Sequence, residues 1–207
     1  MELNQKFTAE TFPHDPEKAT LEGRNKFIAF WLFLGGETVL FSSLFATFLA
    51  LRNSTAGGSA AHEMFEPSTV FLATMLLLTS SLTSVYAMYH MKNFNHKQMM
   101  VWLSITVLLG LGFLILEINE FTHYVEHYHF TIKSSAFGSS FYLLVGTHGA
   151  HVLVGLLWIT TLMLRNAKRG LNLYNAPKFY VASLYWHFID VVWIFIFTVV
   201  YLIGMVG

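Results

Sequence analysis

The chain has 207 residues, of which 55% are hydrophobic, 16% are aromatic and only 12% are charged. A soluble domain of this size would need more charge to cover its surface, and a formal net charge of zero gives no reason to expect a nucleic-acid partner. The absence of cysteine excludes disulfides and thiolate metal ligands.

A polar tail, residues 1–26, precedes five long apolar stretches that are separated by short polar joints. Each stretch reaches the ~20 residues that a helix needs to cross a bilayer core of ~30 Å. Lipid offers the backbone no hydrogen-bond partners, so unbroken apolar runs of this length are helices. The sequence therefore predicts an all-α fold, in which residues 27–207 form one polytopic transmembrane bundle with helices at about 27–51, 68–90, 99–121, 137–164 and 179–206.

The basic residues predict the orientation of this bundle. The tail and the joints after the second and fourth stretches hold all the lysines and arginines except Arg52 and Lys133. Because positively charged loops stay in the cytoplasm, we expect a cytoplasmic N-terminus and an external C-terminus.

Two groups of small or hydroxyl residues bear on how the helices pack. Gly36, Ser43 and Ala50 recur every seven residues, which predicts a seam where another helix approaches closely. The second stretch carries five hydroxyl side chains near its middle. Such hydroxyls can bond the carbonyls of their own helix, so we expect no functional role for this group, which comprises Thr79, Ser80, Ser81, Thr83 and Ser84.

Seven acidic or histidine side chains lie inside the predicted helices, with no lysine or arginine beside them. An ionised acid at the bilayer centre costs about 2.5–3.5 kcal/mol, so these groups should face protein or a polar crevice and be partly protonated. A rise of ~1.5 Å per residue places five of them in one mid-membrane polar layer and two nearer the outer face. The layer comprises Glu37, His148, His151, His187 and Asp190, and the outer pair is Glu117 and Glu120.

The spacing of these residues leaves their role open. Three pairs stand three residues apart, so the members of each pair should share a helix face. Such groups can hydrogen-bond one another and fix helix packing, and acids and histidines on facing helices can also build di-metal sites. Glu37 has no partner on its own helix, so a proton, lipid or inter-subunit role is also possible.

Residues 185–193, YWHFIDVVW, resemble the signature of subunit III of the haem-copper respiratory oxidases, the cytochrome c oxidase subunit 3 family. Residues 146–151, GTHGAH, are similar to the paired-histidine motif of that family. Glu37, followed by Val39-Leu40-Phe41, resembles the membrane glutamate that carbodiimide reagents modify in the family. The resemblance covers residues 24–207 and is strongest to the short five-helix form of Gram-positive bacteria.

This resemblance implies a non-catalytic subunit of a cytochrome c oxidase, a complex that reduces oxygen to water and translocates protons across the bacterial plasma membrane. It implies that haem and copper reside in partner subunits, and that this multi-pass chain binds no cofactor beyond structural phospholipid. The implied partners are subunit I as the main contact, subunit II, a small subunit IV and membrane lipids. The implied role is to stabilise subunit I, support proton uptake and protect the catalytic core from inactivation during turnover.

The chain also departs from the family pattern, and other interpretations stay open. It lacks the first two helices of the seven-helix members, and Tyr180 stands where many relatives carry an acid. Subunit III of a quinol oxidase would share the motifs, because other subunits choose the electron donor. From other classes, a membrane di-metal oxygenase or a proton-coupled transporter with Glu37 as the carrier would also place ionisable groups in the membrane.

Overall fold

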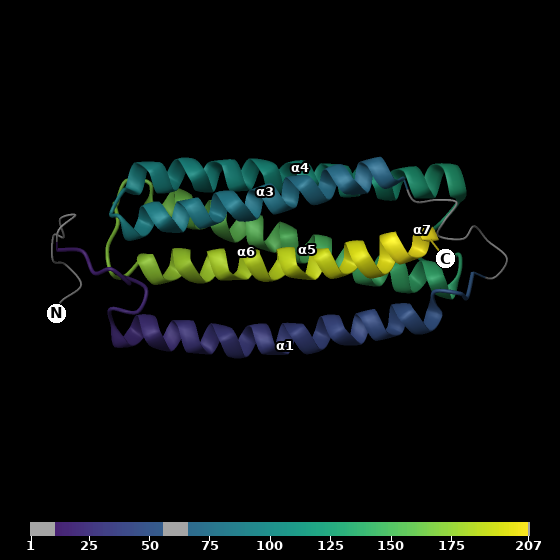
Figure 1. Cartoon of the computed structure of the whole chain (residues 1–207), viewed down its shortest axis with the longest axis horizontal. Helices are drawn as coiled ribbons and strands as arrows, with labels where there is room; N and C mark the ends of the chain where they lie inside the picture. The colour runs from purple at the N-terminus through teal and green to yellow at the C-terminus, as the bar shows by residue number, and fades with distance from the viewer. Residues whose placement is uncertain (1–10, 56–65, 207) are drawn as a thin grey trace.

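The computed structural model of the chain describes residues 11–55 and 66–206. Five helices in this part of the chain are long and apolar enough to cross a membrane, which confirms the predicted all-α fold. They are α1 (Leu21–Leu51), α3 (Pro67–Lys92), α4 (His96–Tyr128), α5 (Ala136–Asn166) and α6 (Ala176–Ile196), and α6 continues through η1 (Phe197–Leu202) into α7 (Ile203–Val206) (Figure 1).

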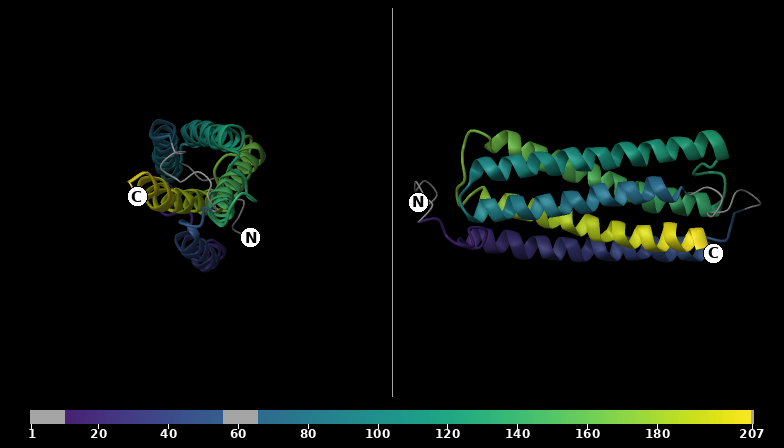
Figure 2. Two further views of the ribbon diagram at one scale, coloured as in Figure 1. Left: turned by 90° about the vertical axis from the view of Figure 1, so that its right-hand side faces the viewer. Right: turned by 45° about the horizontal axis from the view of Figure 1, so that its top comes forward.

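Four of the helices close into a ring, and the fifth lies outside it. Helix α3 packs against α4, α4 against α5, α5 against α6, and α6 against α3, as the end-on view in Figure 2 shows. Helix α1 contacts α5 and α6 and stays on the outside of the ring. Only 11% of the apolar segment of α1 is buried, against 50% for the last span. Most of α1 therefore faces whatever surrounds the chain.

Helix α1 packs through large residues and not through the predicted seam of small ones. Leu34, Phe41 and Phe48 recur every seven residues, and each is only 3% exposed. Gly36, Ser43 and Ala50 stand two positions later and are exposed. The residues of α1 that pack against other helices therefore do recur every seven positions, as predicted. They are the large apolar residues, which α5 and α6 cover, and not the small ones.

Glycine allows the closest packing inside the ring, around Trp186. This side chain is fully buried, and its indole N–H donates to the hydroxyl of Ser80 on α3 at 3.0 Å. A Cβ added at Gly110 of α4 would lie 2.7 Å from the indole ring, and one added at Gly155 of α5 would lie 3.1 Å from it. The indole thus occupies the centre of the ring because two neighbouring helices have no side chain there.

Two helices extend by six or seven residues beyond a predicted end. Helix α1 begins at Leu21, inside the predicted tail, because the Thr20 side chain caps it by accepting from the N–H of Gly23 at 3.0 Å. Helix α4 continues to Tyr128 and so includes residues 122–128, which were predicted to be loop. It ends at His129, whose positive φ of 49° reverses the chain. Residues 1–10 of the predicted tail lie outside the described residues.

The last helix changes its winding near its C-terminal end. Residues Phe197–Leu202 form a π-helix, in which each turn takes up more chain than an α-helical turn does. Tyr201 lies in this segment, is fully buried, and donates its hydroxyl to Glu120 on α4 at 3.1 Å. The π-helical turn thus lies where the last helix makes a polar contact inside the ring.

Candidate functional site

The polar contact between α1 and α5 joins two of the predicted site residues. Oε2 of Glu37 lies 3.1 Å from Nε2 of His151, and their side chains are 16% and 20% exposed. The ring of Phe41 covers the histidine on the α1 side. On the α6 side, the hydroxyl of Tyr185 donates to the backbone carbonyl of His151 at 3.3 Å. The carboxyl and the imidazole therefore meet in a half-buried position between three helices.

The hydrogen bonds of His151 fix how many protons this pair holds. Its Nδ1 lies 2.7 Å from the carbonyl oxygen of Thr147, and a carbonyl can only accept, so Nδ1 carries a hydrogen. One more proton must lie between Nε2 of His151 and Oε2 of Glu37, because two lone pairs would otherwise face each other at 3.1 Å. Whichever atom carries that proton, the pair has no net charge, which suits a position inside the membrane.

His148 faces the interior of the ring and not α1. It is fully buried, its Nε2 lies 3.3 Å from the carbonyl oxygen of Ile189, and its ring packs beside Phe113 and Trp193. We expected His148 and His151 to share a helix face, but their side chains contact different helices: His148 contacts α6, and His151 contacts Glu37 on α1. Residues three positions apart on an α-helix point in directions that differ by about 60°. Here this difference is enough to direct the two imidazoles toward different helices.

His187 and Asp190 belong to the contact between α6 and α3. Nδ1 of His187 lies 2.7 Å from the hydroxyl of Ser81, and its Nε2 lies 3.4 Å from that of Ser183. Asp190 is 4% exposed, and the side chain nearest to its carboxyl as a hydrogen-bond donor is the hydroxyl of Ser81, which also faces His187. The predicted layer is thus split between two helix contacts, one with α1 and one with α3.

The hydroxyl cluster of α3 also belongs to the site, because its side chains bond neighbouring helices, which was not predicted from the sequence. Besides Ser81, Ser84 bonds the hydroxyl of Ser183 at 2.7 Å, and Thr83 bonds that of Thr106 at 2.8 Å. We expected these hydroxyls to serve only their own helix, and Thr79 does so, at the exposed face. Five hydroxyl residues within six positions were the signal for a polar contact with neighbouring helices.

Glu117 lies deeper in the bundle than its predicted place beside Glu120. Its carboxyl lies against Gly149, where an added Cβ would come within 2.5 Å of Oε2, and it is 4% exposed. Gly149 is next to His148, so the carboxyl is level with the interior histidine. Helix α4 ends at Tyr128, seven residues beyond the predicted end at 121, so Glu117 lies eleven residues before that end.

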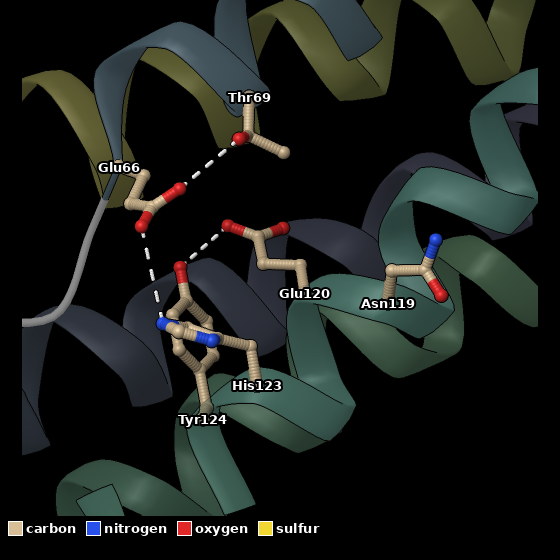
Figure 3. Close-up of a pocket in the computed structure, with 6 residues that line it drawn as sticks. All are labelled: Glu66, Thr69, Asn119, Glu120, His123 and Tyr124. Atoms are coloured by element: carbon tan, nitrogen blue, oxygen red, sulfur yellow. Dashed lines mark hydrogen bonds and ion pairs between the residues drawn. The ribbon is translucent and has the colours of Figure 1, made fainter. Parts of the chain in front are cut away.

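Glu120 lies nearer the C-terminal end of α4, where it lines a pocket of about 270 Å³ (Figure 3). Its carboxyl accepts hydrogen bonds from the hydroxyls of Tyr124 and Tyr201. Across the pocket, Glu66 accepts from the hydroxyl of Thr69 at 3.3 Å and lies 3.9 Å from Nε2 of His123. This end of the ring therefore combines acidic, imidazole and hydroxyl groups in a pocket at the surface of the protein.

No group of three or more histidine or acidic side chains within residues 11–55 and 66–206 is arranged to hold a metal ion. The three deep histidines instead bond protein groups: His151 bonds a carboxyl, His187 a hydroxyl and His148 a backbone carbonyl. The arrangement can hold helices in register and hold protons in place, both without redox chemistry.

Comparison with known proteins agrees with the motifs. The profile of the family described as cytochrome c oxidase subunit III matches residues 10–205. The chain is 75% identical over 207 residues to the cytochrome c oxidase subunit 3 of Bacillus subtilis (strain 168), with 100% of both chains covered. The chain belongs to the cytochrome c oxidase subunit III family. It is also 73% identical over 208 residues to the cytochrome c oxidase subunit 3 of Bacillus sp. (strain PS3), again with 100% of both chains covered.

Family membership confirms the resemblance seen in the sequence and makes the chain a membrane-embedded subunit of a haem-copper oxidase complex. The quinol oxidase subunit 3 of Bacillus subtilis (strain 168) is more distant, at 51% identity over 185 residues, which cover 89% of this chain and 90% of that relative. The identities thus favour a cytochrome c oxidase over a quinol oxidase. As a subunit III, the chain presents the Glu37–His151 pair at the contact of its outermost helix.

Proposed function

We propose that this subunit III is a non-catalytic accessory subunit that stabilises subunit I of a cytochrome c oxidase while the complex reduces oxygen to water and translocates protons. Its other partners are subunit II and a small subunit IV, and haem and copper belong to the partner subunits. The observation that carries this proposal is the Glu37–His151 contact, a half-buried one-proton pair that needs no cofactor. Helix α1, with most of its apolar surface uncovered, provides surface for a partner subunit or lipid.

The Glu37–His151 pair is proposed to support proton uptake and to preserve activity during turnover, together with the polar groups around His148, His187 and Asp190. Glu37→Ala removes the only side-chain partner of Nε2 of His151 that the described residues supply. Loss of one partner of a buried hydrogen bond costs about 1–3 kcal/mol, which would loosen α1 from the ring. We expect an oxidase with unchanged haem content whose activity decays faster under continuous turnover.

Glu37→Gln is the matched control, because an amide N–H can donate to the bare Nε2 of His151 and keep the contact. If the contact alone matters, the glutamine variant retains the parent lifetime. If the shared proton matters, this variant decays as fast as Glu37→Ala. Equal lifetimes for Glu37→Ala and the parent complex would remove the functional role of the pair.

We propose that the chain lies in the bacterial plasma membrane with its N-terminus in the cytoplasm. All the described lysines and arginines except Arg52 and Lys133 lie at the end of the bundle where α1 begins. Because the chain has no cysteine, Lys133→Cys and Lys168→Cys each introduce a single thiol. An impermeant thiol reagent applied to intact cells should label position 133 and leave position 168 unlabelled, and the opposite pattern would reverse the topology.

A structural phospholipid is proposed for the groove between α1, α5 and α6 near the cytoplasmic end. The groove has a volume of about 390 Å³, and its apolar wall includes Phe30, Phe33 and Trp158. Lys26 and Lys178 stand at its edge, where their ammonium groups suit an anionic headgroup. Lipid extraction and mass spectrometry of the purified oxidase should find less anionic phospholipid in a variant that combines Lys26→Gln and Lys178→Gln, and an unchanged lipid content would contradict this assignment.

The electron donor is proposed to be cytochrome c, on the strength of the higher identity to cytochrome c oxidase subunits. The tagged chain, purified gently with its partners, should bring down a haem-containing complex that oxidises reduced cytochrome c. Oxidation of a quinol in place of cytochrome c would identify the second candidate, a quinol oxidase. A coloured, oxygen-consuming chain without partners would contradict the accessory role itself.

A further inference from the structure

The interior of the ring formed by α3, α4, α5 and α6 contains buried polar atoms that lack partners. Within the described residues, these are Oε1 of Glu117, Nδ1 of His148 and both carboxyl oxygens of Asp190. The three residues come from α4, α5 and α6 and are 4%, 0% and 4% exposed. Native proteins rarely leave such atoms unpaired, because each loses its hydrogen bonds to water and gains nothing in return. A partner is therefore required.

The hydrogen bond of His148 shows what kind of partner its Nδ1 needs. Nε2 lies 3.3 Å from the carbonyl oxygen of Ile189, which can only accept, so Nε2 carries the hydrogen of the neutral ring. Nδ1 is then a bare acceptor in need of a donor. The ring of His148 lies beside Phe113, one helical turn before Glu117 on α4, and Glu117 lies against Gly149. The Glu117 carboxyl and the His148 imidazole thus lie at the same level of the bundle, on the facing helices α4 and α5.

The hydroxyl groups on this side of the bundle are already engaged. Thr74 accepts from the indole N–H of Trp193 and donates to the carbonyl of Val70. Likewise, Ser80 accepts from the indole N–H of Trp186 and donates to the carbonyl of Leu77. Thr106 bonds the carbonyl of its own helix and the hydroxyl of Thr83. Nδ1 of His148 consequently lacks a donor from any of these side chains.

We propose that the inside of this ring binds ordered water, with one molecule that bridges Nδ1 of His148 and Oε1 of Glu117. Water has the required chemistry, because one of its hydrogens can bond Nδ1 while the other bonds the carboxyl oxygen. Buried waters commonly make about three hydrogen bonds to groups that would otherwise be unpaired.

The outer pocket lies one helical turn from Glu117, so we expect water to enter from this side. Glu120 lies one turn above Glu117 on α4 and lines the pocket that opens at the outer end (Figure 3). Its carboxyl accepts from Tyr124 and Tyr201, so polar groups continue from the pocket toward the interior. The water site thus lies behind Glu120 and is separate from the Glu37–His151 pair, and it does not depend on the role proposed for that pair.

A cryo-electron microscopy map of the intact oxidase, at a resolution that shows ordered water, tests the proposal directly. We expect a density peak within hydrogen-bond distance of both Nδ1 of His148 and Oε1 of Glu117. A direct bond between the two side chains, or an empty gap between them, would overturn it. This test needs no variant, so a failure to assemble cannot obscure it.

A pair of variants of the same complex gives a second test. Gly149→Ala places a methyl group where the Glu117 carboxyl now lies, so the carboxyl must move and the bridging peak should be lost. Gly146→Ala on the same helix meets nothing within 4 Å and should keep the peak. A peak that persists unchanged in Gly149→Ala would show that the water is not held by the Glu117 carboxyl and would overturn the bridge.

Discussion

Gly110→Ala tests the packing at the centre of the ring. The new methyl carbon would lie 2.7 Å from the indole of Trp186 and 2.8 Å from a methyl group of Leu156, well inside van der Waals contact. Trp186 is fully buried and bonded to Ser80, so it has little freedom to move away. Overpacking of this kind costs about 1–3 kcal/mol. The helix itself gains about 1 kcal/mol from the exchange of glycine for alanine.

Gly112→Ala separates these two contributions. Gly112 is on the same helix, and an added Cβ would stand 3.5 Å from Leu76, which is an ordinary contact. Both variants share the gain in helix propensity, so the difference between them isolates the clash with Trp186. Gly110→Ala should therefore be less stable than Gly112→Ala by about 1–3 kcal/mol.

The assay is the retention of subunit III in the detergent-purified oxidase as the temperature rises, followed on native gels. Gly110→Ala should release the subunit at a lower temperature than the parent, and Gly112→Ala at the parent temperature or above. At one temperature, the ratio of released to bound subunit should differ by about tenfold for each ~1.4 kcal/mol. Identical release curves for the two variants would refute the claim that Trp186 packs against Gly110.

Three further variants probe polar contacts. Ser81→Ala removes the bond to Nδ1 of His187 and should weaken the joint between α3 and α6 by about 1 kcal/mol, measured as earlier release of the subunit on heating. Trp193→Phe keeps an aromatic side chain but loses the indole N–H bond to Thr74 on α3 and part of the buried ring, and should cost at least about 1–3 kcal/mol in the same assay. Lys92→Ala should raise the pKa of the Asp15 carboxyl, which the Lys92 ammonium now lowers through a 2.6 Å hydrogen bond, and carbon-13 labelling of aspartate reports that pKa.

Each of these variants has a control or a contrary outcome. Thr79→Ala removes an exposed hydroxyl that bonds only its own helix, and a loss as large as that of Ser81→Ala would discount the contact with α6. Only two aspartates occur in the chain, so the Asp15 signal is distinguished from the buried Asp190. Because its pKa is lowered on folding, Asp15 stabilises the tail contact above its ordinary pKa and loses that effect as the pH falls through the lowered value. An Asp15 titration that does not change in Lys92→Ala would contradict the ion pair.

The sequence was sufficient to predict the five helices, because the length of an apolar run is a property of each segment by itself and does not depend on how the segments pack. It was also sufficient to place Glu37 and His151 at a similar depth. The end of α4 could not be predicted in this way, because it depends on a tertiary feature: Tyr124 is buried beside Phe130 and Phe141, beyond the apolar run.

The direction in which a side chain points could not be obtained from depth or spacing. His148 and His151 differ by a modest rotation about α5, but this rotation decides between the interior of the ring and the surface of α1. The hydroxyls of α3 show the same limit. Ser81 can bond its own helix or α6, and only the position of His187 on the neighbouring helix decides between them.

The π-helical turn at Phe197–Leu202 matters for anyone who modifies the outer end of the last helix. A change that converts this segment to α-helical winding without removing a residue would rotate every later side chain by about 100°, because a π-helical turn takes up about one residue more than an α-helical turn does. Tyr201 would then swing away from Glu120. A linker or affinity tag at this end should therefore be joined beyond the turn, with the residues inside it left unchanged.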